Sequence, residues 1–320
     1  MYLGPVTAIK KSHKQTYIYG PVPSRRLGYS LGIDILPYKT CSLDCIYCQL
    51  GPTPKKTVER KNYFPVNDIL SCIKQAVDLG HRIDYITFSG SGEPTLNKTI
   101  GELIRKIKKI TDIPVAVLTN STLLTREDVR TALLAADLAV PSLDAATQDI
   151  FLQINRPHPS LKVSEILAGL IEFRKQFKGK IWLEILFVKG INDSHQHLME
   201  LKKAVEIIRP DKIHLNTVVR PPAEITAQPV SMSSLEQIQK FFGDKAEIVA
   251  EFQGKDQMPY QEDVSDRILD MVKRRPVTLD DIASSLGKHR NAVLKELNAL
   301  LQKNKIKTVI YKKKRYYEPS

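Results

Sequence analysis

The stretch GIDILPYKTCSLDCIYCQLG, residues 32–51, carries three of the chain's four cysteines. Its first six residues read as a buried strand. Cys41, Cys45 and Cys48 follow with the spacing C-x3-C-x2-C. Three thiols are one ligand short of a structural zinc site, and no histidine close in sequence completes it. A [4Fe–4S] cluster held through three of its irons, with the fourth iron open, fits this spacing better than zinc does.

Outward from this stretch, β-branched runs alternate with amphipathic helical patterns from about residue 30 to 217. The expected strands are residues 32–37, 84–90, 114–119, 138–144, 180–188 and 211–218. The expected helices are residues 66–80, 98–111, 125–136, 164–177 and 194–209. This alternation predicts an α/β fold with right-handed βαβ units and a parallel sheet, either open or curved into a partial barrel. Ligands are then expected at the carboxyl ends of the strands.

The pattern changes after about residue 218. A proline-rich loop, a helix over 233–243 and a strand over 246–251 precede a linker at 252–263. Residues 264–320 then predict three helices and a β-hairpin, with Thr278 as the N-cap of the second helix and Gly287 ending it. This order resembles a winged helix-turn-helix domain. We therefore expect two domains, at residues 1–255 and 264–320.

Positive charge is concentrated in the second of these domains. The whole chain has 48 basic and 35 acidic residues, a formal charge of +13, whereas residues 264–320 have 14 basic and 6 acidic residues, a net +8. A local excess favours a binding surface for RNA or DNA over a generally basic exterior, with protein docking as the alternative. The candidate nucleic-acid contacts lie at the start of the third helix and at the hairpin tip: Lys288, Arg290, Lys312, Lys313, Lys314 and Arg315. Tyrosines interleaved with the tip, Tyr311, Tyr316 and Tyr317, suit base stacking.

Cysteine usage and hydropathy bound the cellular setting. Four cysteines, three of them crowded together, do not form a disulfide framework, which favours a reducing compartment. The sequence has no run of 18 apolar residues and no apolar region near its start. We therefore expect a cytoplasmic protein with no membrane partner.

Two motifs together resemble the radical S-adenosylmethionine (SAM) superfamily. One is the cysteine motif with an aromatic residue, Tyr47, before its last cysteine, and the other is Gly-Ser-Gly-Glu-Pro at residues 90–94, after the second expected strand. The family's usual form is Gly-Gly-Glu-Pro, so Ser91 replaces one glycine. The resemblance implies a partial (βα)6 TIM-like barrel of the radical SAM type. It also implies an electron donor such as flavodoxin or ferredoxin.

The same resemblance implies cofactors and their contacts. SAM chelates the open iron of a [4Fe–4S] cluster, and its reductive cleavage gives a 5′-deoxyadenosyl radical that abstracts hydrogen from a substrate. Glu93 accepts hydrogen bonds from the ammonium of SAM, and the glycines let the backbone approach the ligand. The expected cofactor-binding residues lie in the two motifs and at the following strand ends: Tyr47, Gly90, Gly92, Glu93, Asn120, Ser142, Asp144, Glu184 and Ile191.

A narrower likeness concerns the substrate. The pattern GPVPSRRLG, from residue 20, followed by CxxxCxxCQLG resembles a radical SAM subgroup loosely related to the tRNA 4-demethylwyosine synthases. Those enzymes use a second cluster, for which this chain has only Cys72 left over, so a second fully cysteine-ligated cluster is excluded. RNA, above all tRNA, is the leading substrate hypothesis. The alternatives are a protein or peptide substrate, as in glycyl-radical activation, and a DNA-binding iron–sulfur redox regulator. The sequence identifies no residue that acts on the substrate.

Overall fold

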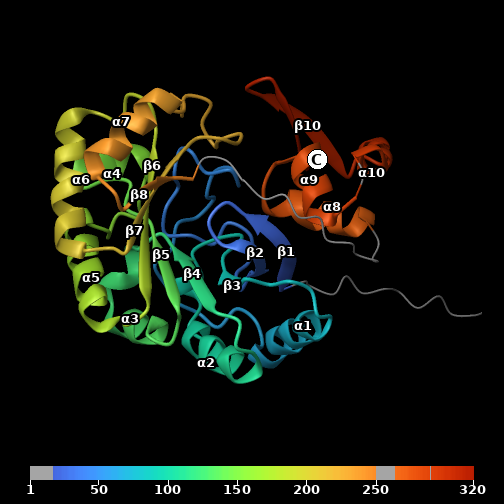
Figure 1. The fold of residues 1–320 in the computed structure, drawn as a ribbon, viewed down its shortest axis with the longest axis horizontal. Helices are drawn as coiled ribbons and strands as arrows, with labels where there is room; N and C mark the ends of the chain where they lie inside the picture. The colour runs from blue at the N-terminus through green and yellow to red at the C-terminus, as the bar shows by residue number, and fades with distance from the viewer. Residues whose placement is uncertain (1–16, 250–263, 289) are drawn as a thin grey trace, which may run out of the picture.

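An open eight-stranded sheet organises most of the molecule in the computed structural model, which describes residues 17–249, 264–288 and 290–320 (Figure 1). The strands follow one another across the sheet in sequence order. They are β1 (Ile18–Ser24), β2 (Gly28–Ile33), β3 (Tyr85–Phe88), β4 (Val115–Thr119), β5 (Leu138–Pro141), β6 (Lys180–Phe187), β7 (Lys212–Thr217) and β8 (Ala246–Ile248). Strands β2 to β8 are parallel, and only β1 is antiparallel to its neighbour.

Helices connect the parallel strands and cover the outside of the sheet (Figure 1). They are α1 (Val66–Asp78), α2 (Ile100–Ile110), α3 (Glu127–Leu133), α4 (Gln148–Ile154), α5 (Val163–Gln176), α6 (His195–Ile208) and α7 (Met232–Phe242). The apolar residues of α2 show why: Ile100, Leu103, Ile104 and Ile107 recur at intervals of three and four and are all fully buried. The mostly parallel α/β fold predicted from the alternation is therefore confirmed, and it is consistent with a partial barrel.

Strand β1 and helix α4 are among the elements that the sequence does not predict. Strand β1 contains Pro21 and Pro23, which argue against a strand, but it lies at the edge of the sheet, where missing N–H donors are tolerated. Helix α4 has only seven residues. Both flank the future site: the β1–β2 turn carries Arg25 and Arg26, and α4 ends beside Asn155.

The C-terminal residues form a second, smaller core. Its elements are α8 (Val264–Arg274), β9 (Val277–Thr278), α9 (Leu279–Leu286), α10 (Arg290–Gln302), β10 (Ile306–Tyr311) and β11 (Lys314–Pro319), with sheet order β10-β11-β9. We call residues 264–320 the C-terminal unit. Thr278 caps α9 in a reciprocal capping box with Asp281, and Gly287 ends that helix with a φ of 58°, as expected. The expected linker at 252–263 lies outside the described residues.

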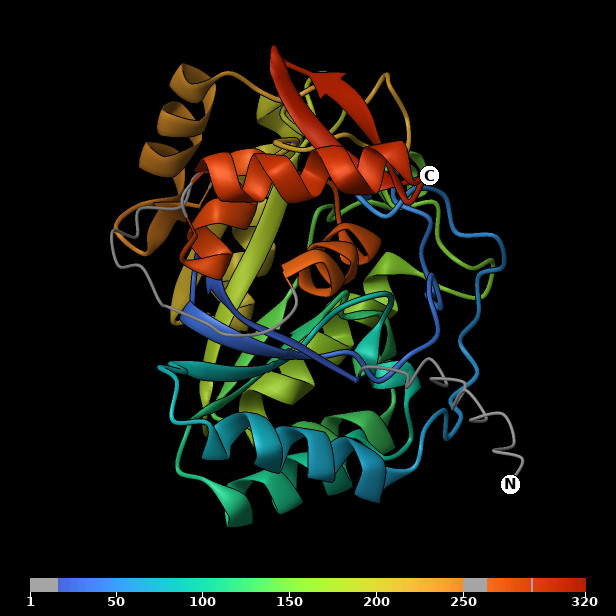
Figure 2. The ribbon, with the colours of Figure 1, turned by 90° about the vertical axis from the view of Figure 1, so that its right-hand side faces the viewer.

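The C-terminal unit packs against the β1–β2 hairpin (Figure 2). The Arg274 guanidinium lies 4.4 Å from the centre of the Tyr19 ring and donates to the Ile18 carbonyl at 3.3 Å. On the other side, the Tyr316 hydroxyl donates to the Val219 carbonyl at 2.9 Å. These contacts bring α8 over the open face of the strand ends.

None of the helices in the described ranges is both long and apolar enough to span a membrane.

Candidate functional site

The cysteine loop follows β2 and is fixed to the rest of the barrel by its backbone. The Asp44 and Ile46 amides donate to the carbonyls of Asn155 and Ile154, each at 3.0 Å. The Cys48 amide closes a turn onto the Cys45 carbonyl at 3.0 Å. All three cysteines of the loop are half-buried free thiols. The loop therefore holds three thiols in a set arrangement without a disulfide.

Each of the three sulfurs accepts a hydrogen bond from a different nitrogen donor. Asn120 Nδ2 lies 3.5 Å from the Cys41 sulfur, and Asn155 Nδ2 lies 3.3 Å from the Cys45 sulfur. Lys39 Nζ donates to the Cys48 sulfur at 3.1 Å. These donors come from the ends of β4 and α4 and from the loop's own entry. Donors of this kind stabilise negative charge on sulfur.

The electrostatics of the thiols follow from their burial. Burial raises the pKa of Cys41 to about 12 and that of Cys45 well above its usual range. Burial also opposes the charge on Lys39, but the hydrogen bond and attraction to Cys48, together with the attraction to Cys41 and Cys45, outweigh burial and raise the Lys39 pKa. Lys39 thus stays a cation although it is only 5% exposed. A buried cation beside three thiols favours their anionic, metal-binding form.

The Gly-Ser-Gly-Glu-Pro turn packs directly on the entry to the cysteine loop. The Lys39 amide donates to the Ser91 carbonyl at 2.7 Å, and the Glu93 amide donates to the Thr40 carbonyl at 3.0 Å. A Cβ on Gly92 would lie 1.9 Å from the Thr40 carbonyl oxygen, so only glycine fits there. The two motifs are therefore one backbone unit.

Gly90 has a related role. It adopts a φ of +149°, and a Cβ there would meet the Asp34 carboxylate carbon at 2.4 Å. That carboxylate accepts hydrogen bonds from the Ser91 amide at 3.0 Å and from the Ser91 hydroxyl at 2.5 Å. Ser91, which departs from the usual motif, thus tethers the turn to the residue after β2. The glycines serve packing between loops as well as the approach of a ligand.

Glu93 is buried and densely hydrogen-bonded. Its Oε1 accepts from the Thr95 amide and hydroxyl and from the Thr119 hydroxyl, and its Oε2 accepts from the Asn120 amide at 2.6 Å. Burial raises its pKa, while these donors lower it and offset part of the rise. Because Oε2 accepts a single protein hydrogen bond, it retains capacity for one more donor.

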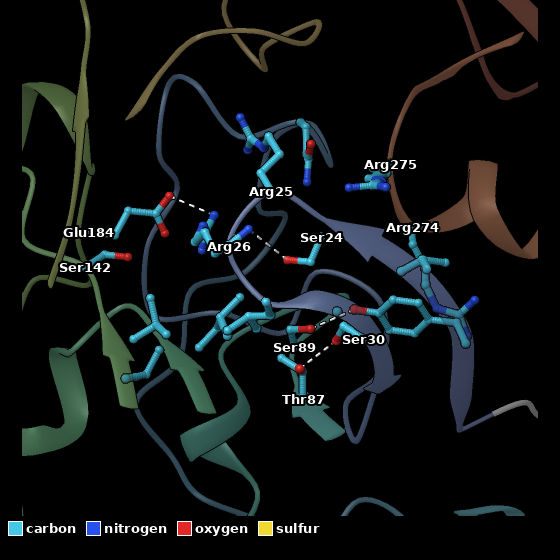
Figure 3. A pocket seen from close by; sticks show the side chains of 18 of the residues that line it. Ser24, Arg25, Arg26, Ser30, Thr87, Ser89, Ser142, Glu184, Arg274 and Arg275 are labelled. Carbon is cyan, nitrogen blue, oxygen red and sulfur yellow. Dashed lines mark hydrogen bonds and ion pairs between the residues drawn. The ribbon is translucent and has the colours of Figure 1, made fainter. Parts of the chain in front are cut away.

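A cavity of about 350 Å³ gathers much of the predicted site at the carboxyl ends of the strands (Figure 3). Its lining includes these residues expected from the sequence: Cys41, Gly90, Gly92, Glu93, Asn120, Ser142 and Glu184. Glu184 is paired with Arg26 at 2.9 Å and accepts from Asn216 Nδ2 at 2.9 Å. Burial raises the Glu184 pKa, but the Arg26 charge, the Asn216 hydrogen bond and the charges of Arg25 and His214 together outweigh burial and leave that pKa lowered.

Other predicted cofactor contacts lie elsewhere. The Tyr47 hydroxyl donates to Asp144 Oδ2, which also accepts from Asn155 Nδ2 at 2.8 Å. The Leu186 amide donates to Asp144 Oδ1 at 2.9 Å, so the protein itself uses both carboxylate oxygens. Ile191 packs on the barrel core. These three residues are outside the cavity lining, and their place near a ribose or adenine stays a prediction.

Sequence reasoning missed several residues of the site. Lys39, two positions before Cys41, drew no attention because a lysine carries no motif signal. Asn155 and Arg220 lie far from the motifs in sequence. Arg274 and Arg275 belong to α8 and its end, yet both line the cavity (Figure 3), whose lining also includes Cys41 and Glu93. These two arginines can be identified only once the packing of the C-terminal unit against the barrel is known.

The predicted nucleic-acid contacts are placed on the C-terminal unit as follows. Lys312 and Lys313 are exposed in the hairpin turn, and Lys314 and Arg315 are exposed on β11. Arg290 begins α10 and is paired with Asp280. Lys288 is half-buried after α9.

The expected base-stacking role of the tyrosines is wrong for two of them. Tyr316 is 5% exposed and Tyr317 is 3% exposed. Tyr316 packs toward the barrel through its bond to Val219, and Tyr317 belongs to the small core. Both rings are therefore taken up by packing and have no face open to a base.

The donor set of the cysteine loop suits an iron–sulfur cluster. Cys41, Cys45 and Cys48 are free thiols on one loop, and each faces a nitrogen donor. Cysteine thiolates are the ligands that hold such clusters. Within the ranges 17–249, 264–288 and 290–320, no three His, Cys, Asp or Glu side chains are grouped as ligands of a single metal ion.

Comparison with known proteins identifies the family. The Radical SAM superfamily model matches residues 35–201. The chain is 34% identical to a UPF0026 protein of Methanocaldococcus jannaschii over 309 residues, which cover 94% of this chain and 95% of the relative. The chain therefore belongs to the radical SAM superfamily of enzymes and, within it, to the UPF0026 proteins.

Two further likenesses have narrower meaning. A protein of Brachyspira hyodysenteriae named GTPase Obg is 40% identical over 94% of this chain, but the chain spans only 45% of that relative. The sequence has no GxxxxGK[ST] phosphate loop, so that name is not transferred. The structure of Streptococcus suis SuiB bound to S-adenosylmethionine has a TM-score of 0.51 at 17% identity, covering 67% of this chain and 49% of that one. It shows a shared fold.

The family uses a [4Fe–4S] cluster and SAM, and the residues present fit both. Cys41, Cys45 and Cys48 would hold the cluster, and Glu93 Oε2 offers the acceptor for an ammonium.

We predict that Glu93→Gln weakens SAM binding to the reconstituted protein by roughly ten- to a hundredfold, because a charge-assisted hydrogen bond is lost. Isothermal titration calorimetry under anaerobic conditions measures it. Glu102→Gln is the matched control, since Glu102 is paired with Lys106 on the surface of α2. Equal affinity in the two variants contradicts the role of Glu93.

A second prediction concerns Lys39. Replacing it by Met removes a buried positive charge from the Cys48 sulfur, which should shift the reduction potential of the cluster to more negative values. An EPR-monitored redox titration measures the shift. Lys55→Met, at an exposed position in the same segment, should leave the potential unchanged. An unchanged potential in Lys39→Met would mean that this cation does not tune the cluster.

Proposed function

We propose that this radical SAM enzyme modifies RNA, with tRNA as the first candidate, and that its C-terminal unit is a winged helix-turn-helix domain that holds the RNA. One observation carries the proposal: Met271, Arg274 and Arg275 of this basic unit line the same cavity as Cys41 and Glu93. A substrate bound to the unit therefore lies against the cofactor residues.

The order of elements supports the winged-helix assignment. Helix α8, the short strand β9, helices α9 and α10 and the β10–β11 hairpin follow one another as in that class of domain. The net charge of +8 on 57 residues supports an anionic partner. Exposed lysines at the hairpin turn suit phosphate contacts, which supply most non-specific affinity for nucleic acids.

In and around the cavity, the chain's own residues bind and orient the cofactors. The three cysteines would hold the cluster, while Lys39, Asn120 and Asn155 donate to their sulfurs. Glu93 would orient SAM through its ammonium. The Arg26–Glu184–Asn216 group forms a polar wall in which the charge of Glu184 is already neutralised.

When bound, the cluster and SAM would supply reductive carbon–sulfur cleavage and, through it, hydrogen abstraction from the substrate. The electron would come from a reduced flavodoxin or ferredoxin, which fits a cytoplasmic setting.

The proposal predicts that total tRNA binds the protein through the hairpin turn. Lys312→Gln/Lys313→Gln should reduce the salt dependence of binding, the slope of log K against log salt, by about 1.5, since each lost cation contributes roughly 0.7–0.9. Fluorescence anisotropy over a salt series measures it. Lys109→Gln/Lys178→Gln removes two exposed charges from the barrel and should leave the slope unchanged.

A cellular measurement completes the test. Nucleoside profiles of tRNA from cells with and without the gene should differ by one modified nucleoside. Identical profiles would overturn the RNA proposal in favour of a protein substrate if, in addition, the protein binds tRNA no more tightly than it binds an acidic peptide. Preference for duplex DNA without SAM cleavage would favour a redox regulator.

A further inference from the structure

Three arginines from three separate parts of the chain meet between two cavities. Arg25 lies in the β1–β2 turn, Arg220 follows β7, and Arg275 follows α8. All three line both the cofactor cavity and a second cavity of about 630 Å³. Figure 3 shows Arg25 and Arg275 facing the cofactor cavity from the hairpin and from the C-terminal unit. The two cavities therefore adjoin at these three residues.

Nearby acids leave much of this charge unmatched. Glu184 is paired with Arg26, and Asp280 is paired with Arg290. Asp281 lies 4.0 Å from Arg220, and its side chain also accepts from the Thr278 amide in the capping box of α9. Asp34 lies 4.0 Å from Arg274 and is bound by Ser91.

The hydrogen bonds of the three guanidinium groups differ. Arg25 donates to the neutral amide oxygen of Asn216 at 3.1 Å. The Nε of Arg220 is buried without a hydrogen-bond partner. In the part of the chain that the structure describes, the Arg275 guanidinium has no hydrogen bond or ion pair. Donor capacity therefore remains on at least two of the three.

The lowered pKa values of two of these arginines are typical of cations gathered at an anion-binding site. Burial, together with the charges of Arg275 and Arg25, lowers the pKa of Arg220 to about 9. Burial and the charge of Arg26 lower the pKa of Arg25 to about 10. Like charges held together away from water cost free energy, which a bound anion recovers.

A phosphate group suits this arrangement. Guanidinium forks bind phosphate oxygens in pairs, and a tetrahedral phosphate presents oxygens to several forks at once. The second cavity continues to Lys314 and Arg315, so further phosphates of a chain would meet further cations.

We propose that Arg25, Arg220 and Arg275 form a phosphate-binding subsite that anchors the substrate at the entrance to the cofactor cavity. The inference rests on the proposed function and names the group by which that substrate is held. The phosphate belongs either to an RNA backbone or to a small phosphorylated molecule. The neighbouring base or sugar then extends toward Cys41 and Glu93.

Inorganic pyrophosphate is the probe for the test, titrated calorimetrically into the anaerobically reconstituted full chain. Wild type should bind it, and Arg220→Gln and Arg275→Gln should each weaken binding by about ten- to a hundredfold. Arg105→Gln removes an exposed charge from α2 and should bind like wild type. Equal binding by all four proteins overturns the subsite.

Thermal unfolding without pyrophosphate separates binding from structure. If the three arginines form an anion site, Arg275→Gln should melt at or above the wild-type temperature, because like-charge repulsion among the arginines is relieved. A lower melting temperature with unchanged pyrophosphate affinity means that Arg275 serves packing, which overturns its assignment.

A parallel binding measurement with tRNA identifies the source of the phosphate. Weaker tRNA binding by Arg220→Gln and Arg275→Gln supports an RNA backbone. Pyrophosphate binding that depends on these arginines, without any tRNA binding, supports the subsite for a small phosphorylated substrate and overturns only the RNA proposal. If neither substitution changes the affinity for tRNA or for pyrophosphate, the result overturns only the subsite.

Discussion

Two backbone hydrogen bonds, from Lys39 to Ser91 and from Glu93 to Thr40, join the cysteine loop to the turn that carries Glu93. They can form only because residue 92 is a glycine, whose missing Cβ leaves room for the Thr40 carbonyl. The pair fixes the thiols and the carboxylate as one unit, so that a cluster and the SAM bound to it meet a preset geometry. The same entry segment carries Lys39, whose cation reaches the Cys48 sulfur.

The sequence was informative wherever a local rule governs the structure. Runs of β-branched residues predict buried parallel strands. Thr278 and Gly287 follow local capping rules that do not depend on tertiary structure. The cysteine spacing and Glu93 were equally readable. Strand β1 was hidden by its prolines, whose tolerance depends on an edge position that only the assembled sheet reveals.

What could not be read depends on contacts between distant segments. Asn155 donates a hydrogen bond to the Cys45 sulfur from 110 residues away in the sequence. The Tyr47 hydroxyl likewise donates to Asp144, 97 residues further along the chain. Tyr316 and Tyr317 looked like stacking residues because sequence does not show that one side of β11 faces the barrel and the other its own core. Arg275 gains meaning only once α8 lies over the cavity. One wall of the cavity is thus set by docking of the C-terminal unit.

The central claim is that the three-cysteine loop and Glu93 form a working SAM-cleaving site. Formation of 5′-deoxyadenosine by the reconstituted, chemically reduced protein, quantified by liquid chromatography, tests it most directly. The account predicts SAM-dependent 5′-deoxyadenosine from wild type and none from Cys41→Ala, Cys45→Ala or Cys48→Ala. Absence of 5′-deoxyadenosine from wild type carrying a full cluster, with and without tRNA, would contradict it.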